Sequence, residues 1–149
     1  MAYDVDLSFI YKNPTRIVFG VNSLKDLGPE VDELKCSRAF VVTDKGVAAA
    51  GLLEKVEQAL GKRWVGTFDD CPQDSGVHIV NQAAELAREK ETDILVSLGG
   101  GSVIDTAKGI AILLKEGGKL EDHYGLQLFT RPQTPHIAIP TTAGTGSEV

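Results

Sequence analysis

The sequence has little cysteine, no long apolar run and no cluster of basic residues. Its two cysteines, Cys36 and Cys71, are too few for a four-ligand zinc site or a disulfide framework, so we interpret both as reduced thiols. No run of about 18 apolar residues occurs, which predicts no transmembrane helix and no membrane partner. The N-terminus is acidic and lacks the basic start and apolar stretch of a signal peptide, which favours the cytoplasm.

The charge balance also argues against one class of partner. The formal net charge is -6, whereas neutralising nucleic-acid phosphates needs clustered Lys and Arg. We therefore expect no nucleic-acid partner. The remaining composition, with 42% hydrophobic and 24% charged residues, is typical of a soluble globular protein. A length of 149 residues suits a single domain with a buried core, so we treat residues 1–149 as one unit.

Short apolar runs bounded by turn residues are typical of strands buried on both faces. Such runs occupy Leu7–Tyr11, Arg16–Gly20, Arg38–Thr43, Arg63–Phe68, Asp93–Leu98 and His136–Pro140. Between them, apolar residues at spacings of three and four predict helices over Ser23–Leu34, Leu52–Leu60, Val77–Glu89 and Ser102–Leu114. This alternation predicts an α/β fold, a parallel sheet with helices on both faces joined by right-handed crossovers.

Ligands of open parallel sheets bind beyond the carboxyl ends of the strands, and three strand ends carry suitable residues. The first is the run Gly99, Gly100, Gly101 and Ser102, between the most apolar strand and the most apolar helix. Glycines let the backbone approach a pyrophosphate, and a helix N-terminus offers unpaired N–H groups with a favourable dipole. Ser102 would be the N-cap, with Asp105 in a capping-box position. The alternative is a tight turn that binds nothing.

The second strand end is Asp44, directly after Arg38–Thr43. Its carboxylate can accept hydrogen bonds from ribose hydroxyls and would repel the additional phosphate of NADP. The alternative is an ordinary N-cap or turn role. The third strand end is Thr141–Glu148, where small residues permit close approach and hydroxyls can contact phosphate, ribose or nicotinamide. A polar tail without a ligand is the alternative there.

Two long segments resemble the hallmark motifs of the iron-containing (group III) alcohol dehydrogenases. They are Leu98–Lys108, with the sequence LGGGSVIDTAK, and Ile139–Val149, with the sequence IPTTAGTGSEV. Val42–Gly46 is similar to the family's first strand-end motif, and Ile17–Gly20 to its opening hairpin region. The similar segments follow one another in the family's order over nearly the whole chain.

The resemblance implies a Rossmann-like domain with a short N-terminal hairpin, followed in the family by an all-helical domain that holds the metal. It implies that Gly99, Gly100, Gly101 and Ser102 face the pyrophosphate and that Asp44 lies by the adenosine ribose, favouring NAD over NADP. Thr141, Thr142 and Thr145 would line the nicotinamide side. Asp74 stands where the family commonly carries Asn, so as a candidate cofactor contact it can accept hydrogen bonds but cannot donate an amide N–H.

The resemblance also implies the activity, hydride transfer between a small alcohol or aldehyde and NAD, assisted by Fe2+ or Zn2+. The family's metal ligands lie beyond the equivalent of Val149, so we assign no metal ligand and no catalytic residue to this chain. His78, His123 and His136 do not match those ligands, and we interpret them as solvated or structural.

Several expectations follow for the chain as a whole. We expect a fragment of a longer protein, inactive as a dehydrogenase by itself, and the resemblance implies a homodimer. Two other functions stay open: a free-standing nucleotide-binding module without catalysis, and a relative of glycerol dehydrogenase or dehydroquinate synthase. The full TTAGTGSE stretch at residues 141–148 favours the iron-type interpretation over the second of these.

Overall fold

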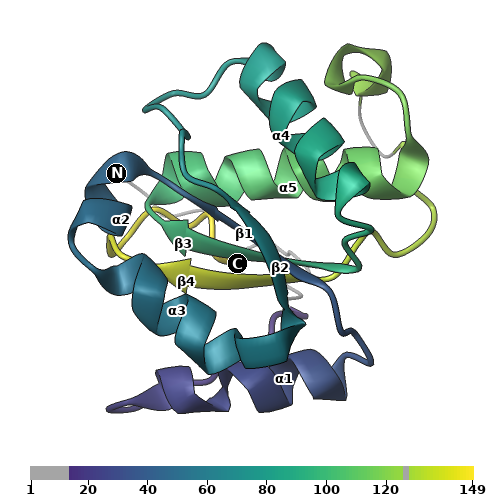
Figure 1. The fold of residues 1–149 in the computed structure, drawn as a ribbon. Helices are drawn as coiled ribbons and strands as arrows, with labels where there is room; N and C mark the ends of the chain where they lie inside the picture. The colour runs from purple at the N-terminus through teal and green to yellow at the C-terminus, as the bar shows by residue number, and fades with distance from the viewer. Residues whose placement is uncertain (1–13, 126–127) are drawn as a thin grey trace, which may run out of the picture.

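The computed structural model describes residues 14–125 and 128–149, and it contains a four-stranded parallel sheet (Figure 1). The strand order is β2-β1-β3-β4. The strands are β1 (Ala39–Thr43), β2 (Trp64–Phe68), β3 (Ile94–Gly99) and β4 (His136–Pro140). The parallel sheet with its α/β alternation is therefore confirmed.

The two central strands explain why apolar runs form this sheet. Every residue of β1 and of β3 is buried, and Val41 lies opposite Val96 in the parallel register. Strands covered on both faces have no solvent side, so they need no polar alternation. The edge strands β2 and β4 are more exposed, and Trp64 at the start of β2 is 42% accessible.

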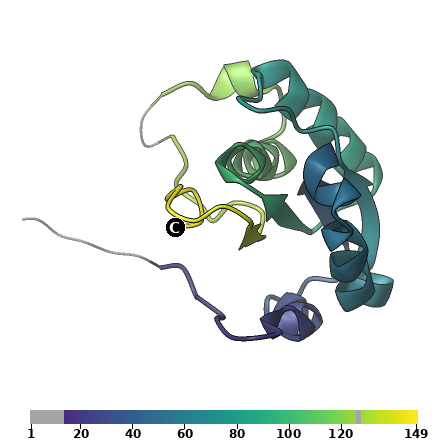
Figure 2. The ribbon, with the colours of Figure 1, turned by 90° about the vertical axis from the view of Figure 1, so that its left-hand side faces the viewer.

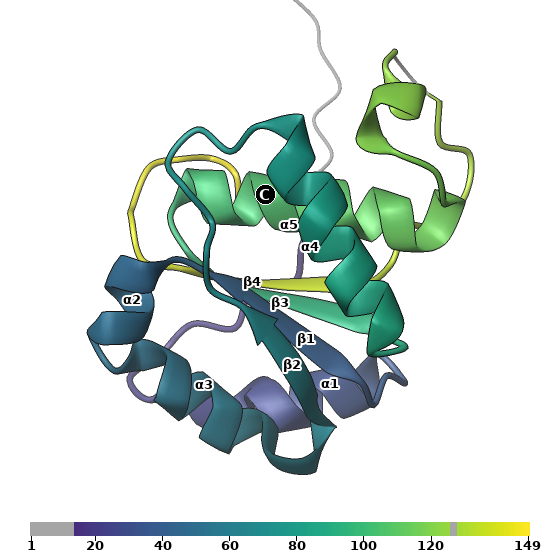
Figure 3. The same ribbon diagram turned by 45° about the horizontal axis from the view of Figure 1, so that its top comes forward.

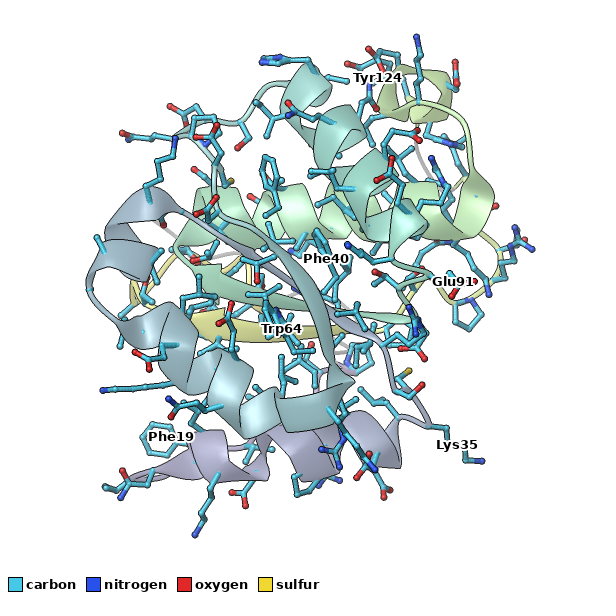
Figure 4. The ribbon with its side chains drawn as sticks, in the orientation of Figure 1. Phe19, Lys35, Phe40, Trp64, Glu91 and Tyr124 are labelled. Carbon is cyan, nitrogen blue, oxygen red and sulfur yellow. The ribbon has the colours of Figure 1, made fainter. Side chains whose placement is uncertain are left out.

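Helices cover both faces of the sheet, as Figures 1 and 3 show. The helices α1 (Leu27–Glu33) and α3 (Leu52–Leu60) pack on one face, where Val31, Val56 and Leu60 join β1 and β3 in a hydrophobic core. On the other face lie α4 (Val77–Glu89) and α5 (Gly101–Glu116). Phe40 of β1, labelled in Figure 4, is 2% accessible and belongs to this second core.

The remaining helices are short. They are α2 (Lys45–Ala49) and the 3-10 helices η1 (Ser23–Asp26), η2 (Gly61–Arg63) and η3 (Leu120–His123). The predicted helix over Ser23–Leu34 is thus divided between η1 and α1. Within the ranges given above, no helix combines the length and apolarity that crossing a bilayer requires.

Two local predictions were wrong. Arg16–Gly20 forms no strand: a strand needs a hydrogen-bonded neighbour, and this segment belongs to neither edge of the described sheet. Its Phe19, which points outward in Figure 4, is 97% accessible. Leu7–Tyr11, the other half of the expected hairpin, lies outside the described residues. Ser102 is not the N-cap of α5, because the helix begins earlier and Gly100 takes that position.

The strand order identifies where a ligand would bind. From β1 the chain crosses to β2 on one side, and it then returns past β1 to β3 on the other side. The direction of winding therefore reverses between β1 and β3. In doubly wound folds, ligands bind at the carboxyl ends of the two strands that flank this switch point. Figure 2 views the molecule from the side on which these carboxyl ends lie.

Candidate functional site

A cleft of about 630 Å³ opens at this switch point. Its walls come from four segments that are far apart in the sequence: residues 44–47 after β1, residues 70–73 after β2, residues 100–103 at the start of α5, and Thr141 with Thr142 after β4. All three strand ends that we predicted from the sequence to contact a ligand therefore line one cleft. The loop after β2 also lines it.

Gly100 and Gly101 form the wall at the start of α5. Gly100 is the N-cap and has no side chain to cap the helix, so the amide groups of the first turn receive no side-chain cap. A Cβ on Gly100 would lie 3.3 Å from Thr142 Oγ1, and one on Gly101 would lie 3.3 Å from Ser147 Oγ. The missing side chains thus keep a narrow space open between the helix N-terminus and the segment after β4.

Gly99 has a different place from its two neighbours. It is the last residue of β3 and is buried, and its carbonyl accepts a hydrogen bond from Thr141 N at 2.9 Å. A Cβ at this position would lie 2.6 Å from Val103 Cγ2, a distance that side chains do not tolerate. Gly99 therefore allows α5 to pack closely against the end of β3, and it does not line the cleft.

Ser102 and Asp74 are brought together, although 28 positions separate them. Asp74 N donates to Ser102 Oγ at 3.2 Å. Asp74 itself has a φ of 53°, in the left-handed region that aspartate tolerates better than most residues. Ser102 lines the cleft and Asp74 is not among its lining residues, but their hydrogen bond holds the loop after β2 against α5.

Asp44 occupies the opposite wall and fills the cap role that the sequence left as an alternative. It is the N-cap of α2, and its Oδ1 accepts from Val47 N at 2.9 Å. Within the described part of the chain, Oδ2 has no hydrogen-bond partner. Thr43, just before it, donates from Oγ1 to Leu98 O at 2.7 Å and ties β1 to β3 at the switch point. Asp44 therefore caps a helix and also presents a carboxylate oxygen at the cleft.

The segment after β4 folds over the start of α5. Thr141 and Thr142 line the cleft, and Thr145 lies beside Gly101. Ser147 Oγ donates to Asp105 Oδ2 at 3.2 Å, and Thr145 Oγ1 donates to Glu148 Oε2 at 2.8 Å. Asp105 thus anchors this segment and makes no capping box with Ser102. The hydrogen bond from Ser147 attaches the segment after β4 to the start of α5.

The structure adds cleft residues that sequence reasoning did not single out. Lys45 pairs with Asp70 across the cleft, with Nζ and Oδ1 2.7 Å apart, and the hydrogen bond that Lys45 donates to Asp70 raises the pKa of Lys45. Cys71 is buried, its Sγ lies 3.3 Å from Thr106 Oγ1, and its N–H donates to Thr43 O. Asp70 and Cys71 lie two and three residues beyond the carboxyl end of β2, in the loop where the rule for parallel sheets places ligand contacts.

The three histidines do not converge on a metal site. His136 Nε2 lies 2.7 Å from Ser97 Oγ, His123 Nε2 lies 2.9 Å from Gly117 O, and His78 is exposed at the start of α4. Residues 14–125 and 128–149 contain no group of three or more His, Cys, Asp or Glu side chains that could hold a metal ion. The described residues therefore do not fit an iron or zinc ion.

The winding of the sheet, the glycine-lined helix N-terminus and the acidic strand end define a Rossmann-like domain of the dinucleotide-binding class. Comparison with known proteins narrows this class. The chain belongs to the iron-containing alcohol dehydrogenase family, which residues 14–149 match. This confirms the resemblance carried by Leu98–Lys108 and Ile139–Val149.

Individual relatives show how much of a family member this chain represents. It is 34% identical over 146 residues to the sulfoacetaldehyde reductase of Bilophila wadsworthia, covering 96% of this chain and 38% of that protein. It is 41% identical over 148 residues to the 4-hydroxybutyrate dehydrogenase of Cupriavidus necator, with the same two coverages of 96% and 38%. The chain therefore spans well under half the length of these relatives.

A solved structure extends the likeness to the fold. The sulfoacetaldehyde reductase from Bifidobacterium kashiwanohense, in complex with NAD+, superposes with a TM-score of 0.87 at 28% identity. The superposition covers 96% of this chain and 38% of that one. The chain corresponds to the N-terminal third of such structures.

Proposed function

We propose that the cleft binds NAD(H) and that the protein transfers hydride between a small alcohol or aldehyde and this cofactor. One observation carries the proposal: the open N-terminus of α5 and the carboxylate of Asp44 face a single cleft at the switch point of the sheet. The NAD+ in the structure of the Bifidobacterium kashiwanohense relative supports the choice of ligand.

The start of α5 would hold the pyrophosphate. The helix runs for 16 residues, and its dipole and first-turn N–H groups favour an anion at this end. Gly100 and Gly101 let phosphate oxygens approach the backbone, and Ser102, which also lines the cleft, offers a hydroxyl. The roles of these residues are to bind the cofactor and to fix its orientation.

Asp44 would bind the adenosine ribose. Because Oδ1 caps α2, Oδ2 is the oxygen placed to accept a ribose hydroxyl. The same charge would repel the 2′-phosphate of NADP, so the cleft should prefer NAD. Asp74 remains a candidate cofactor contact, and its carboxylate could accept hydrogen bonds from the cofactor but could not donate them.

The threonines after β4 would hold the nicotinamide end. Thr141 and Thr142 line the cleft where β4 ends, and β3 lies between β4 and the strand β1 that precedes Asp44. Thr145 packs beside Gly101. Their hydroxyls can orient the nicotinamide amide and keep its ring at one edge of the cleft. When bound, the nicotinamide supplies the chemistry by accepting or donating the hydride.

The metal that the family name implies has no place among the described residues, so the metal and the substrate pocket would belong to other parts of the protein. We therefore expect residues 1–149 to show no appreciable dehydrogenase activity alone. The measurement is NADH formation from small alcohols with Fe2+ or Zn2+ added to the purified chain. Turnover at the rate of a complete family member would contradict this expectation.

Calorimetric titration of the chain with NADH, and in parallel with NADPH, tests the binding proposal. Saturable binding that prefers NADH is the expected result. Equal or tighter binding of NADPH would remove Asp44 as the discriminating residue. Absence of binding by either cofactor, to a chain shown to be folded by circular dichroism, would overturn the proposal.

A further inference from the structure

Lys45 is the single cation among the residues that line the cleft, all of which lie in the described part of the chain. It is the first residue of α2 and stands next to Asp44, at the end of the cleft assigned to the ribose. Its ammonium does not face the cleft alone, because Asp70 from the loop after β2 binds it at 2.7 Å. The ion pair thus joins two walls of the cleft.

Acidic charge dominates this end of the cleft. Asp44 and Asp70 both line it, and Asp69 adds a further favourable charge interaction with the Lys45 ammonium. Recognition of NADP in Rossmann-like folds requires the opposite arrangement, a basic side chain free to pair with the 2′-phosphate. Lys45 is positioned for that role, yet its charge is already matched by a carboxylate.

We propose that Asp70 is a cofactor-specificity residue, which acts by holding the Lys45 ammonium so that this cation cannot pair with the 2′-phosphate of NADP. The proposal rests on the proposed function, because it concerns the same cleft and the same ligand. Asp44 discriminates by direct repulsion, whereas Asp70 acts through Lys45. The two carboxylates therefore contribute separately to the preference for NAD.

The strength of the ion pair sets the size of the effect. Both side chains are largely exposed, at 74% and 68%, and exposed ion pairs contribute little to stability. Asp70→Asn should therefore leave the fold intact while releasing Lys45. Because such an exposed ion pair holds the ammonium only weakly, its release should lower the Kd for NADPH by about threefold. The Kd for NADH should change by less than about twofold, since NADH offers no 2′-phosphate to this cation.

A double-mutant cycle tests the mechanism. Kd values for NADPH and NADH are measured for the unaltered chain, Asp70→Asn, Lys45→Met and the double variant. We expect the gain in NADPH binding to appear in Asp70→Asn and to vanish when Lys45 is also replaced. Glu85→Gln, which breaks an ion pair with Arg88 on the outside of α4, is the matched control and should leave both Kd values unchanged.

The outcomes separate this inference from the proposed function. If the unaltered chain binds NADH but Asp70→Asn gains no affinity for NADPH, the inference is wrong and the proposed function stands. If the gain persists in the double variant, removal of a negative charge explains it, and the role given to Lys45 is overturned. If the unaltered chain binds no NADH, the proposed function and this inference fail together.

Discussion

The polar groups at the two ends of the sheet differ in their partners: those at the amino end bind each other, whereas several at the carboxyl end face the cleft. At the amino end, Asp93 precedes β3, and its carboxylate accepts from the backbone N–H groups of Ser37 at 2.9 Å and of Arg38 at 2.8 Å. The Arg38 guanidinium in turn donates to the carbonyls of Lys90 and Glu91. Glu91 is labelled at this end in Figure 4. The polar groups of this network are matched by other groups of the chain.

At the carboxyl end, comparable groups face a cleft. Asp44 uses one carboxylate oxygen as a cap, and α5 begins at a glycine without a side-chain cap. An aspartate in the loop before a strand and an aspartate in the loop after one therefore have different roles in the same sheet. Polar groups that satisfy each other hold the fold together, whereas polar groups left open at the switch point are available to a ligand.

The largest expected effect is the loss of NADH binding in Gly100→Val, at the carboxyl end of the sheet. The backbone of Gly100, with φ of -81° and ψ of -171°, suits other residues, but the new side chain would fill the space next to Thr142 Oγ1. Loss of phosphate contacts at the helix N-terminus should weaken NADH binding by about a hundredfold or more, measured by calorimetry. The control is Gly20→Val, an exposed position with open space around it, where binding should not change. Equal effects at both positions would contradict the assignment of Gly100 to a phosphate-binding wall of the cleft.

Replacing Asp93 and Asp44 by alanine, one at a time, should separate a role in stability from a role in NADH binding. Asp93→Ala leaves two backbone N–H groups without their partner and should lower the free energy of unfolding by about 2 kcal/mol, with NADH affinity preserved. Asp44→Ala should cost about 1 kcal/mol through the lost cap, and it should also weaken NADH binding by about tenfold. Denaturant unfolding and calorimetry measure the two effects. A loss of NADH binding in Asp93→Ala at native stability would be inconsistent with the account.

His136, at the amino end of β4, should make the fold sensitive to acid. Burial, with a smaller contribution from the Lys108 ammonium, lowers the pKa of His136 to about 4. The unfolded chain, with the pKa near its usual value, binds this proton more readily, so stability is lost as pH falls from about 6.5 toward 4. Allowing for partial exposure, the loss should be about 1.5 kcal/mol. It should disappear in His136→Asn and persist in His78→Asn, as followed by denaturant unfolding at several pH values.

Much of the fold could be predicted because buried elements have strong local patterns. The bounds of β4 and α4 coincide with the predicted His136–Pro140 and Val77–Glu89. The predicted Asp93–Leu98 differs from β3 by a single residue at each end. These segments are bounded by turn residues or carry one apolar face, so their sequence alone limits where they begin and end.

The start of α5 and the far wall of the cleft could not be predicted in this way. Serine is a preferred N-cap, yet Gly100 takes the position because the turn after β3 begins the helix earlier. The approach of Asp70 to Lys45 and of Cys71 to Thr43 depends on β2 lying beside β1. No local sequence pattern specifies the order of strands in a sheet. Contacts between the loops that follow neighbouring strands are therefore visible only in the three-dimensional structure.

An NMR titration of the isotopically labelled chain with NADH, with every assigned backbone amide followed, tests directly whether a nucleotide binds at the switch point of the sheet. We expect shifts concentrated at Gly100, Gly101 and Ser102 and at Asp44–Val47, with the amides of Ser37, Arg38 and Asp93 unchanged. Shifts centred on the amino end of the sheet, or spread evenly over both ends, would contradict a nucleotide site at the switch point.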